Sequence, residues 1–170
     1  MISPDTGEIA MKTVGLLFLL ASLPAFAQSE ISGTVHVVDG NTIHVTTDSG
    51  TIKVRLQGIA APEDNQPGGK EATAFLEQYA EGEPVRCTLD GSTFQKNEVG
   101  ICYVAGRDIA AAVIRAGLAR DCPAFSGGRY WPIERPEAQK LVLPDYCDDG
   151  TGSISKQTRI VLPSHSARRR

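Results

Sequence analysis

The sequence predicts a mainly β domain that carries two helices. Two observations predict the strands: β-branched residues flank a tight turn at Asp39-Gly40, and a second turn follows at residues 48–50. A third observation predicts the helices, because apolar residues recur every three or four positions over two later stretches. With 170 residues, of which 41% are hydrophobic, the chain is long enough for one ordinary core.

The first strands form a hairpin followed by a third strand. Asp, Gly and Asn adopt positive φ at low cost, so residues 39–41 suit the hairpin turn. The polar stretch 90–98 is expected to be a loop. Because the third strand ends beside the first turn, polar groups from both can form a site there. The five expected strands span residues 31–39, 41–48, 51–59, 85–89 and 99–104.

Two later segments are expected to be helical. The first is 70–80, ended by Gly82 and Pro84, and the second is 109–119, capped by Asp108. In the first, the residues on the buried face are Ala72, Phe75, Leu76 and Tyr79.

The C-terminal part lacks a regular pattern. From residue 121 onward, prolines and glycines interrupt the chain, and a short helical turn is expected only around 137–141. Residues 148–170 are interpreted as a flexible tail that ends in Arg168-Arg169-Arg170. These arginines could touch an anionic surface, although a solvated end is the default interpretation.

The N-terminus has the features of an export signal over residues 1–27. A short charged region begins at Met11, an apolar stretch covers 14–20, and Ala25-Phe26-Ala27 is a small-x-small cleavage site. The apolar stretch is too short to span a bilayer, which takes about 20 residues. We therefore expect a mature, periplasmic or secreted domain over 28–147 with no membrane association, and we take Met11 as the true start.

Export makes disulfides the favoured interpretation of the cysteines. An even number of cysteines in an oxidising compartment suggests two disulfides, with three possible pairings. The spacing of a zinc site is absent, and no histidine lies close in sequence to a lone cysteine. The favoured pairing joins cysteines of consecutive strands and brackets the C-terminal loops: Cys87–Cys102 and Cys122–Cys147.

The charge of the chain argues against a strongly basic nucleic-acid-binding face. The net charge is −3. Residues 1–27 carry two acidic groups and one lysine, so without them and the three C-terminal arginines the net charge is −5. Proteins that bind nucleic acid through phosphates usually carry a basic face. Any contact with nucleic acid is therefore expected to be local and weak.

Three runs carry a resemblance to a known family: "VVDGNT", "VRLQGIAAPE" and "GICYVAGRDIAAAVIRAGLAR". In this order, over about residues 31–130, they resemble the thermonuclease (staphylococcal-nuclease-like) family. The resemblance implies an α+β fold, with a five-stranded OB-type barrel, two helices and a disulfide-tied C-terminal segment in place of the family's third helix. It also implies calcium-dependent phosphodiesterase chemistry.

The resemblance assigns five site positions, of which two keep the family's residue. Arg55 corresponds to a transition-state arginine and Glu63 to the water-positioning glutamate. Asn41 and Ala60 stand where the family has the aspartates that bind calcium, and Asn97 stands where it has a second arginine. Calcium prefers several oxygen ligands, with carboxylates among them.

These substitutions predict a degenerate site. Loss of both carboxylates weakens calcium binding, and loss of a guanidinium removes charge stabilisation of the transition state. We therefore expect no metal, and a pseudoenzyme that acts as a binding or interaction module, with single-stranded nucleic acid or a nucleotide as a weak partner. The alternative is an active, secreted calcium-dependent nuclease on DNA or RNA, in which Lys96 and Asp64 could in part replace the missing groups.

Several residues have a structural interpretation beside the functional one. Arg55 and Glu63 could form an ion pair, and Asp39 is a turn-former. His36 and His44 lie equally far from Gly40, so they could face each other across the hairpin and bind a metal, although exposed histidines are usually polar surface.

An aromatic group near the C-terminus could stack on bases or sugars. Packing within the core and loops is the alternative. The group comprises Phe125, Tyr130 and Trp131, with Arg120 and Arg129 nearby.

Overall fold

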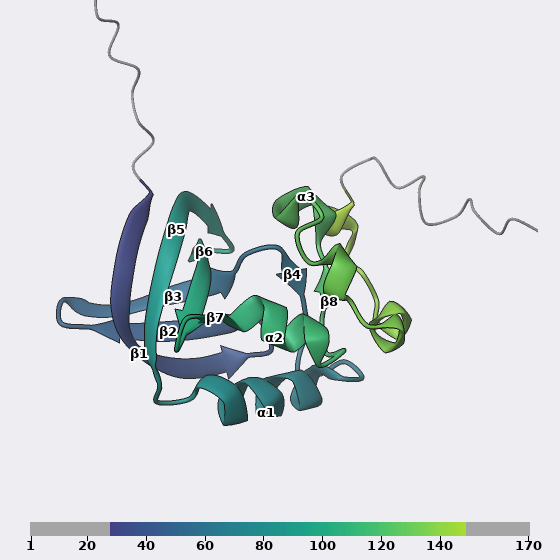
Figure 1. The fold of residues 1–170 in the computed structure, drawn as a ribbon, viewed down its shortest axis with the longest axis horizontal. Coiled ribbons are helices and arrows are strands. Elements are labelled where there is room, and N and C mark those ends of the chain that lie inside the picture. Colours follow the sequence, from purple (N-terminus) through teal and green to yellow (C-terminus); the bar gives the residue numbers. More distant parts are fainter. Residues whose placement is uncertain (1–27, 149–170) are drawn as a thin grey trace, which may run out of the picture.

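The structure is a computed structural model that describes residues 28–148 as a closed five-stranded barrel with helices packed on it (Figure 1). The strand order is β3-β2-β1-β5-β6-β7, and a further parallel pairing of β3 with β6 closes the barrel. This confirms the predicted OB-type, α+β fold. The barrel strands are β1 Ser29–Asp39, β2 Thr42–Thr47, β3 Gly50–Leu56, β5 Pro84–Phe94 and β6 Asn97–Val104.

Both predicted helices are present. The first is α1, Gly69–Ala80, and it packs across one end of the barrel, below the strands in Figure 1. The second is α2, Ile109–Arg115, and the Asp108 carboxylate accepts the Ala111 N–H as its N-cap. It is shorter than the predicted 109–119 because Gly117 takes a left-handed φ of 77°.

Short elements were missed or only partly predicted from the sequence. A third α-helix of one turn, α3 (Pro123–Ser126), was not predicted. The helical turn expected around 137–141 is η2, a 3-10 helix. The remaining short elements are β4 Ile59–Ala60, β7 Arg107–Asp108, β8 Arg120–Asp121, η1 Trp131–Ile133, η2 Pro136–Lys140 and η3 Asp145–Cys147.

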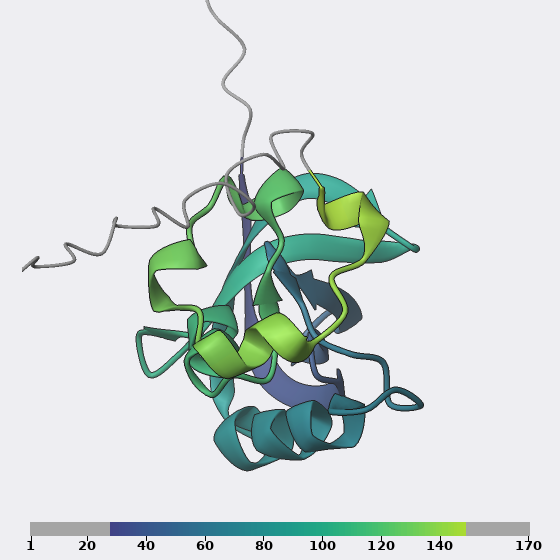
Figure 2. The same ribbon diagram turned by 90° about the vertical axis from the view of Figure 1, so that its right-hand side faces the viewer.

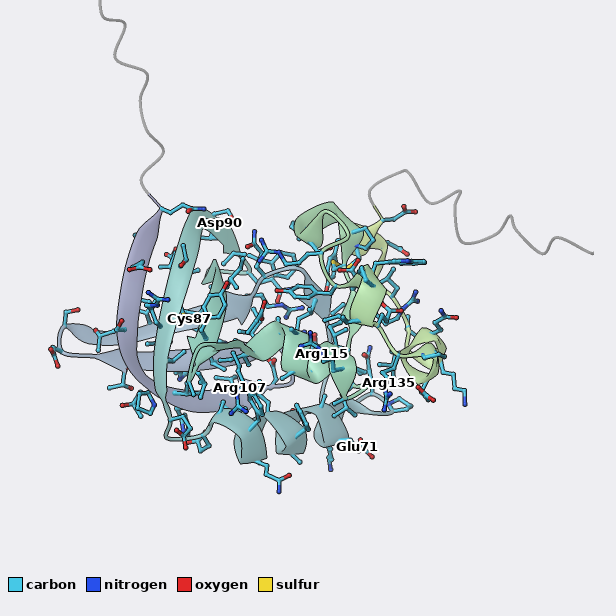
Figure 3. All side chains as sticks on the ribbon, in the orientation of Figure 1. Glu71, Cys87, Asp90, Arg107, Arg115 and Arg135 are labelled. Atoms are coloured by element: carbon cyan, nitrogen blue, oxygen red, sulfur yellow. A yellow bond between two sulfur atoms is a disulfide. The ribbon has the colours of Figure 1, made fainter. Side chains whose placement is uncertain are left out.

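The expected loop over 90–98 is wrong. Strand β5 continues to Phe94, and β6 begins at Asn97, so the two strands form a long hairpin. The register shifts between Leu89 and Thr93, where Gly91 has a φ of 80° and the Asp90 carboxylate accepts the Ser92 N–H. Figure 3 labels Asp90 at this bulge, near the upper end of β5.

The two disulfides join the pairs that the sequence favoured. Cys87 and Cys102 face each other on β5 and β6, with Cys87 labelled in Figure 3. Cys122 joins Cys147 and ties the C-terminal segment to the barrel. In Figure 2 this segment, green to yellow, faces the viewer on the side of the barrel above α1. No helix within residues 28–148 is long and apolar enough to cross a membrane.

The predicted export signal and nearly all of the predicted tail lie outside the described residues, which begin at 28 and end at 148. Their assignments stay predictions.

Candidate functional site

The turn between β1 and β2 is held tightly against the rest of the molecule. The Asp39 carboxylate accepts the Asn41 N–H at 2.9 Å, so Asp39 forms the turn, as predicted. A Cβ added to Gly40 would lie 2.6 Å from the Ala72 Cβ and 2.9 Å from the Ala61 Cβ. Only glycine therefore lets this turn sit between α1 and the chain that follows β4.

Asn41 uses its amide within the protein. Its side chain is buried, and its Nδ2 donates to the Ala61 carbonyl over 3.5 Å. Its Oδ1 accepts the Thr42 hydroxyl at 3.2 Å. The resemblance assigns a calcium carboxylate to position 41 and a calcium-binding carbonyl to position 61. In this chain the two groups bond to each other instead.

The Ala60 side chain has no oxygen that could bind a metal, and it is buried. It is 2% exposed and packs with Leu143 and the two cysteines of the C-terminal disulfide. Strand β4, which carries Ala60, pairs with β8, with Ala60 opposite Arg120. The disulfide-tied segment therefore covers the position at which the family carries its second carboxylate.

The donor atoms at the assigned ligand positions 41, 60 and 61 are a poor fit to calcium. Calcium takes six to eight oxygen ligands, with carboxylates supplying most of the affinity. The implied site offers one amide oxygen and one carbonyl, and both already have partners. Across residues 28–148, no three histidine, cysteine or acidic side chains lie together where they could hold a metal ion.

Arg55 lies outside the barrel wall beneath the C-terminal segment. Val54 and Leu56, its neighbours on β3, are buried in the core, so the alternation of the strand turns Arg55 to the other face. There it is only 8% exposed. Its Nη2 donates to the Tyr146 hydroxyl at 3.3 Å, and its guanidinium lies 5.4 Å from the centre of the Phe94 ring.

Three aromatic rings gather beside Arg55 and line a pocket of about 50 Å³. Phe94 lies 5.0 Å from Tyr146 and 6.2 Å from Phe125, measured between ring centres. Phe94 was not predicted as a site residue because it fell in the expected loop, and Tyr146 was not predicted because it is 91 residues from Arg55. Thr93 and Phe94 are both residues that favour strands, and this local preference could have predicted that Phe94 lies in a strand.

Glu63 lies on a short loop that is closed by its own hydrogen bonds. Gln66 N–H donates to the Glu63 carbonyl at 2.7 Å, while the Gln66 side chain accepts the Glu63 N–H. The Glu63 side chain is exposed. The predicted ion pair between Arg55 and Glu63 is wrong: among residues 28–148, no salt bridge joins them, because Arg55 is engaged by Tyr146 instead.

The other site positions lie as follows. Asn97 is buried at the start of β6, opposite Phe94, and β6 pairs with the strand that carries Arg55. Lys96 is exposed in the hairpin turn with a φ of 68°. Asp64 accepts the Thr73 hydroxyl at 2.7 Å, so it is directed toward α1.

The histidines face each other as predicted. His36 is opposite His44 in the register, with ring centres 6.3 Å apart. The His36 Nδ1 lies 2.7 Å from a Glu81 oxygen, and the Val37 N–H donates to the other oxygen. The Val37 N–H and then His36 lower the pKa of Glu81. Glu81 therefore serves as a local acceptor on the surface.

The predicted stacking group does not form one platform. Tyr130 is buried, and its hydroxyl donates to Asp108 at 3.0 Å. Trp131 is exposed, and Arg120 lies 3.6 Å from Glu134. Of this group, only Phe125 contributes to the aromatic pocket.

Comparison with known proteins shows which family the chain resembles. Residues 53–130 match the model of a family described as staphylococcal nuclease homologue. The chain carries a staphylococcal-nuclease-like domain. The matched range contains Arg55, Glu63 and both helices α1 and α2, and it ends at Tyr130, before Tyr146 and the second cysteine of the C-terminal disulfide.

Two relatives of this staphylococcal-nuclease-like chain have names that describe a nuclease. A protein of Escherichia coli O157:H7, named "Uncharacterized endonuclease", is 25% identical over 134 residues, which is 76% of this chain and 85% of the relative. A micrococcal nuclease of Shigella flexneri is 33% identical over 85 residues, which is 50% of this chain and 48% of the relative.

Asp121, next to the covering disulfide, makes a pH dependence testable. Burial raises its pKa, and hydrogen bonds from Ser126 and the Tyr130 N–H only partly oppose this. At low pH, Asp121 is protonated in both the folded and the unfolded protein, so its burial does not lower the free energy of unfolding through its charge. The loss of stability develops as the pH rises from the ordinary pKa of the unfolded state to the raised pKa of the folded state. Asp121→Asn should therefore stabilise the protein at pH 7 more than at pH 3, measured by urea unfolding. An equal effect at both pH values would contradict this.

Proposed function

We propose that this domain binds single-stranded nucleic acid or nucleotides on a nuclease fold that has lost calcium-dependent hydrolysis, in the periplasm or outside the cell. The observation that carries the proposal is the burial of Ala60 against the Cys122–Cys147 disulfide. Position 60 supplies no carboxylate, and its side chain is buried against that disulfide. Asn41 strengthens the argument because its amide bonds the Ala61 carbonyl.

The residues that remain favour binding. Arg55 offers a permanent positive charge, and Phe94, Phe125 and Tyr146 offer ring faces beside it. A cation next to aromatic faces suits a phosphate and its base, without need of a metal. The acidic body of the protein implies weak affinity that falls further with salt. Two disulfides suit an oxidising compartment.

The test measures hydrolysis and binding separately. We expect the oxidised protein, residues 28–170, to leave single-stranded DNA uncut with or without calcium, and to bind a short fluorescent oligonucleotide in EDTA. Arg55→Ala should weaken binding about tenfold, the effect of losing one charge-assisted contact. The matched control is Arg86→Ala, since Arg86 is exposed on β5. Cleavage that requires calcium and Glu63, or equal binding by both variants, would overturn the proposal.

A second candidate is an active calcium-dependent nuclease. It is favoured by the presence of Arg55 and Glu63 and by the names of the relatives. The two candidate functions predict different results for the variant Glu63→Ala. An active nuclease loses cleavage in this variant, whereas a binding domain keeps its affinity because Glu63 is exposed and lies outside the aromatic pocket.

A further inference from the structure

The C-terminal strap, defined as residues 143–147, covers the one arginine that the proposed site depends on. Tyr146 accepts a hydrogen bond from the Arg55 guanidinium, and its ring closes the aromatic pocket above it. As a result Arg55 is 8% exposed, although it lies on the outer face of the barrel. By contrast, the side chain of Arg86 on β5 is 62% exposed. The strap therefore restricts the access of an anion to Arg55, so binding by the oxidised protein is expected to be weak.

The strap makes few hydrogen bonds to the rest of the protein. Its backbone hydrogen bonds at Pro144–Cys147 and Asp145–Asp148 are internal to the turn η3. Within residues 28–148, the hydrogen bond from Arg55 to Tyr146 is the one that joins residues 143–147 to the barrel. At 3.3 Å it is long for a charged donor. Apolar packing of Leu143 and the contacts of the Tyr146 ring with Phe94 and Phe125 add to this.

The disulfide is the main anchor of the strap. Cys147 directly follows Tyr146 and is bonded to Cys122, and both are buried. On the other side, the Cys122 N–H donates to the Gly58 carbonyl at 2.9 Å, which fixes Cys122 against the end of β3. Because Tyr146 is the residue before Cys147, the covalent bond holds its side chain close to Arg55. Without it, one long hydrogen bond and the packing of Tyr146 and Leu143 would have to hold the strap in place.

We propose that the strap is a disulfide-held cover: oxidised Cys122–Cys147 keeps Tyr146 on Arg55 and limits its exposure, and reduction of that bond increases the access of anionic ligands to Arg55. A dithiol reductant supplies the two electrons and two protons. Its thiolate attacks one sulfur, the mixed disulfide resolves within the reductant, and Cys122 and Cys147 are left as thiols while the reductant becomes a disulfide. This inference concerns access to Arg55 and stands whether or not the domain binds nucleic acid.

The test measures how fast phenylglyoxal, an arginine-selective dicarbonyl, modifies Arg55 in the full mature chain, with the site mapped by mass spectrometry. In the oxidised protein, phenylglyoxal should modify Arg55 more slowly than it modifies Arg86. Cys122→Ser with Cys147→Ser should speed modification of Arg55 about tenfold, as expected when one charge-assisted hydrogen bond no longer holds the closed form. The rate at Arg86 should stay the same.

The variant Tyr146→Ala tests the proposal even if the double serine variant does not fold. It keeps both disulfides and removes only the side chain that covers Arg55. It should also speed modification of Arg55, whereas Val142→Ala, a change at an 81% exposed residue beside the strap, should not. In the native protein treated with dithiothreitol, Arg55 reactivity should rise with the thiols of Cys122 and Cys147 and not with those of Cys87 and Cys102. Unchanged Arg55 reactivity in Tyr146→Ala would overturn the proposal.

Discussion

Replacing Ala60 by aspartate is expected to lower the free energy of unfolding by about 2–4 kcal/mol, and calcium is not expected to restore it. The change puts back a carboxylate that the family uses as a metal ligand. Yet residue 60 is 2% exposed and faces the Cys122–Cys147 disulfide and Leu143. A charge buried against sulfur and methyl groups loses its hydration and gains little in return.

One neighbour limits the size of this effect. Arg120 is opposite Ala60 in the register of β4 and β8, and its Nε has no hydrogen-bond partner among residues 28–148. It could supply part of the missing counter-charge, although it already lies 3.6 Å from Glu134. For this reason we expect a loss below the upper range for an unpaired buried charge, which is about 5 kcal/mol.

Urea unfolding with and without millimolar calcium measures the effect. Ala60→Asn is the matched control, because it adds the same volume without the charge, so the difference between the two variants isolates the electrostatic cost. The pair Asn41→Asp with Ala60→Asp gives calcium its best chance to bind. If calcium raises the stability of this double variant but not of the natural protein, the prediction is contradicted. The C-terminal segment can then move aside, and two substitutions are enough to restore a calcium site.

The first hairpin and the helices α1 and α2 could be predicted from the sequence because their causes are local. The Asp39-Gly40-Asn41 turn, the periodic face of 70–80 and the Asp108 cap each depend on neighbouring residues. The placement of Arg55 near the first turn followed as well, since Thr42 and Arg55 are partners in adjacent strands of the barrel.

The surroundings of Arg55 could not be predicted because they depend on the tertiary fold. Tyr146 reaches Arg55 across 91 residues, through a disulfide and a stretch of 3-10 turns that has no periodic pattern. Phe94 lies beyond a bulge at Gly91, where polar residues conceal the continuing strand. From the sequence, Glu63 was therefore the natural partner of Arg55, while in the structure aromatic rings take that place.

Gly69→Ala is expected to cost about 3 kcal/mol or more of stability and to displace the loop that carries Glu63. A Cβ at this position would lie 1.9 Å from the Glu63 carbonyl oxygen and 2.9 Å from the Asp64 Cα. These are backbone atoms, so no side chain can rotate out of the way. The loop is also closed by the bonds of Gln66 to Glu63 and of Gly69 to Gln66, and it would have to shift as a unit.

Helix propensity alone predicts that Gly69→Ala would raise the stability of the protein. Gly69 is the first residue of α1, and alanine is favoured over glycine within helices by about 1 kcal/mol. Lys70→Ala, at the exposed next residue, serves as the control and should be nearly neutral. If Gly69→Ala proves as stable as the natural protein, the loop moves freely and the position of Glu63 carries no information about its role. If the natural protein has calcium-dependent cleavage and the variant lacks it under conditions in which it is still folded, the close approach at Gly69 positions Glu63 for that cleavage. The nuclease candidate then replaces the binding domain.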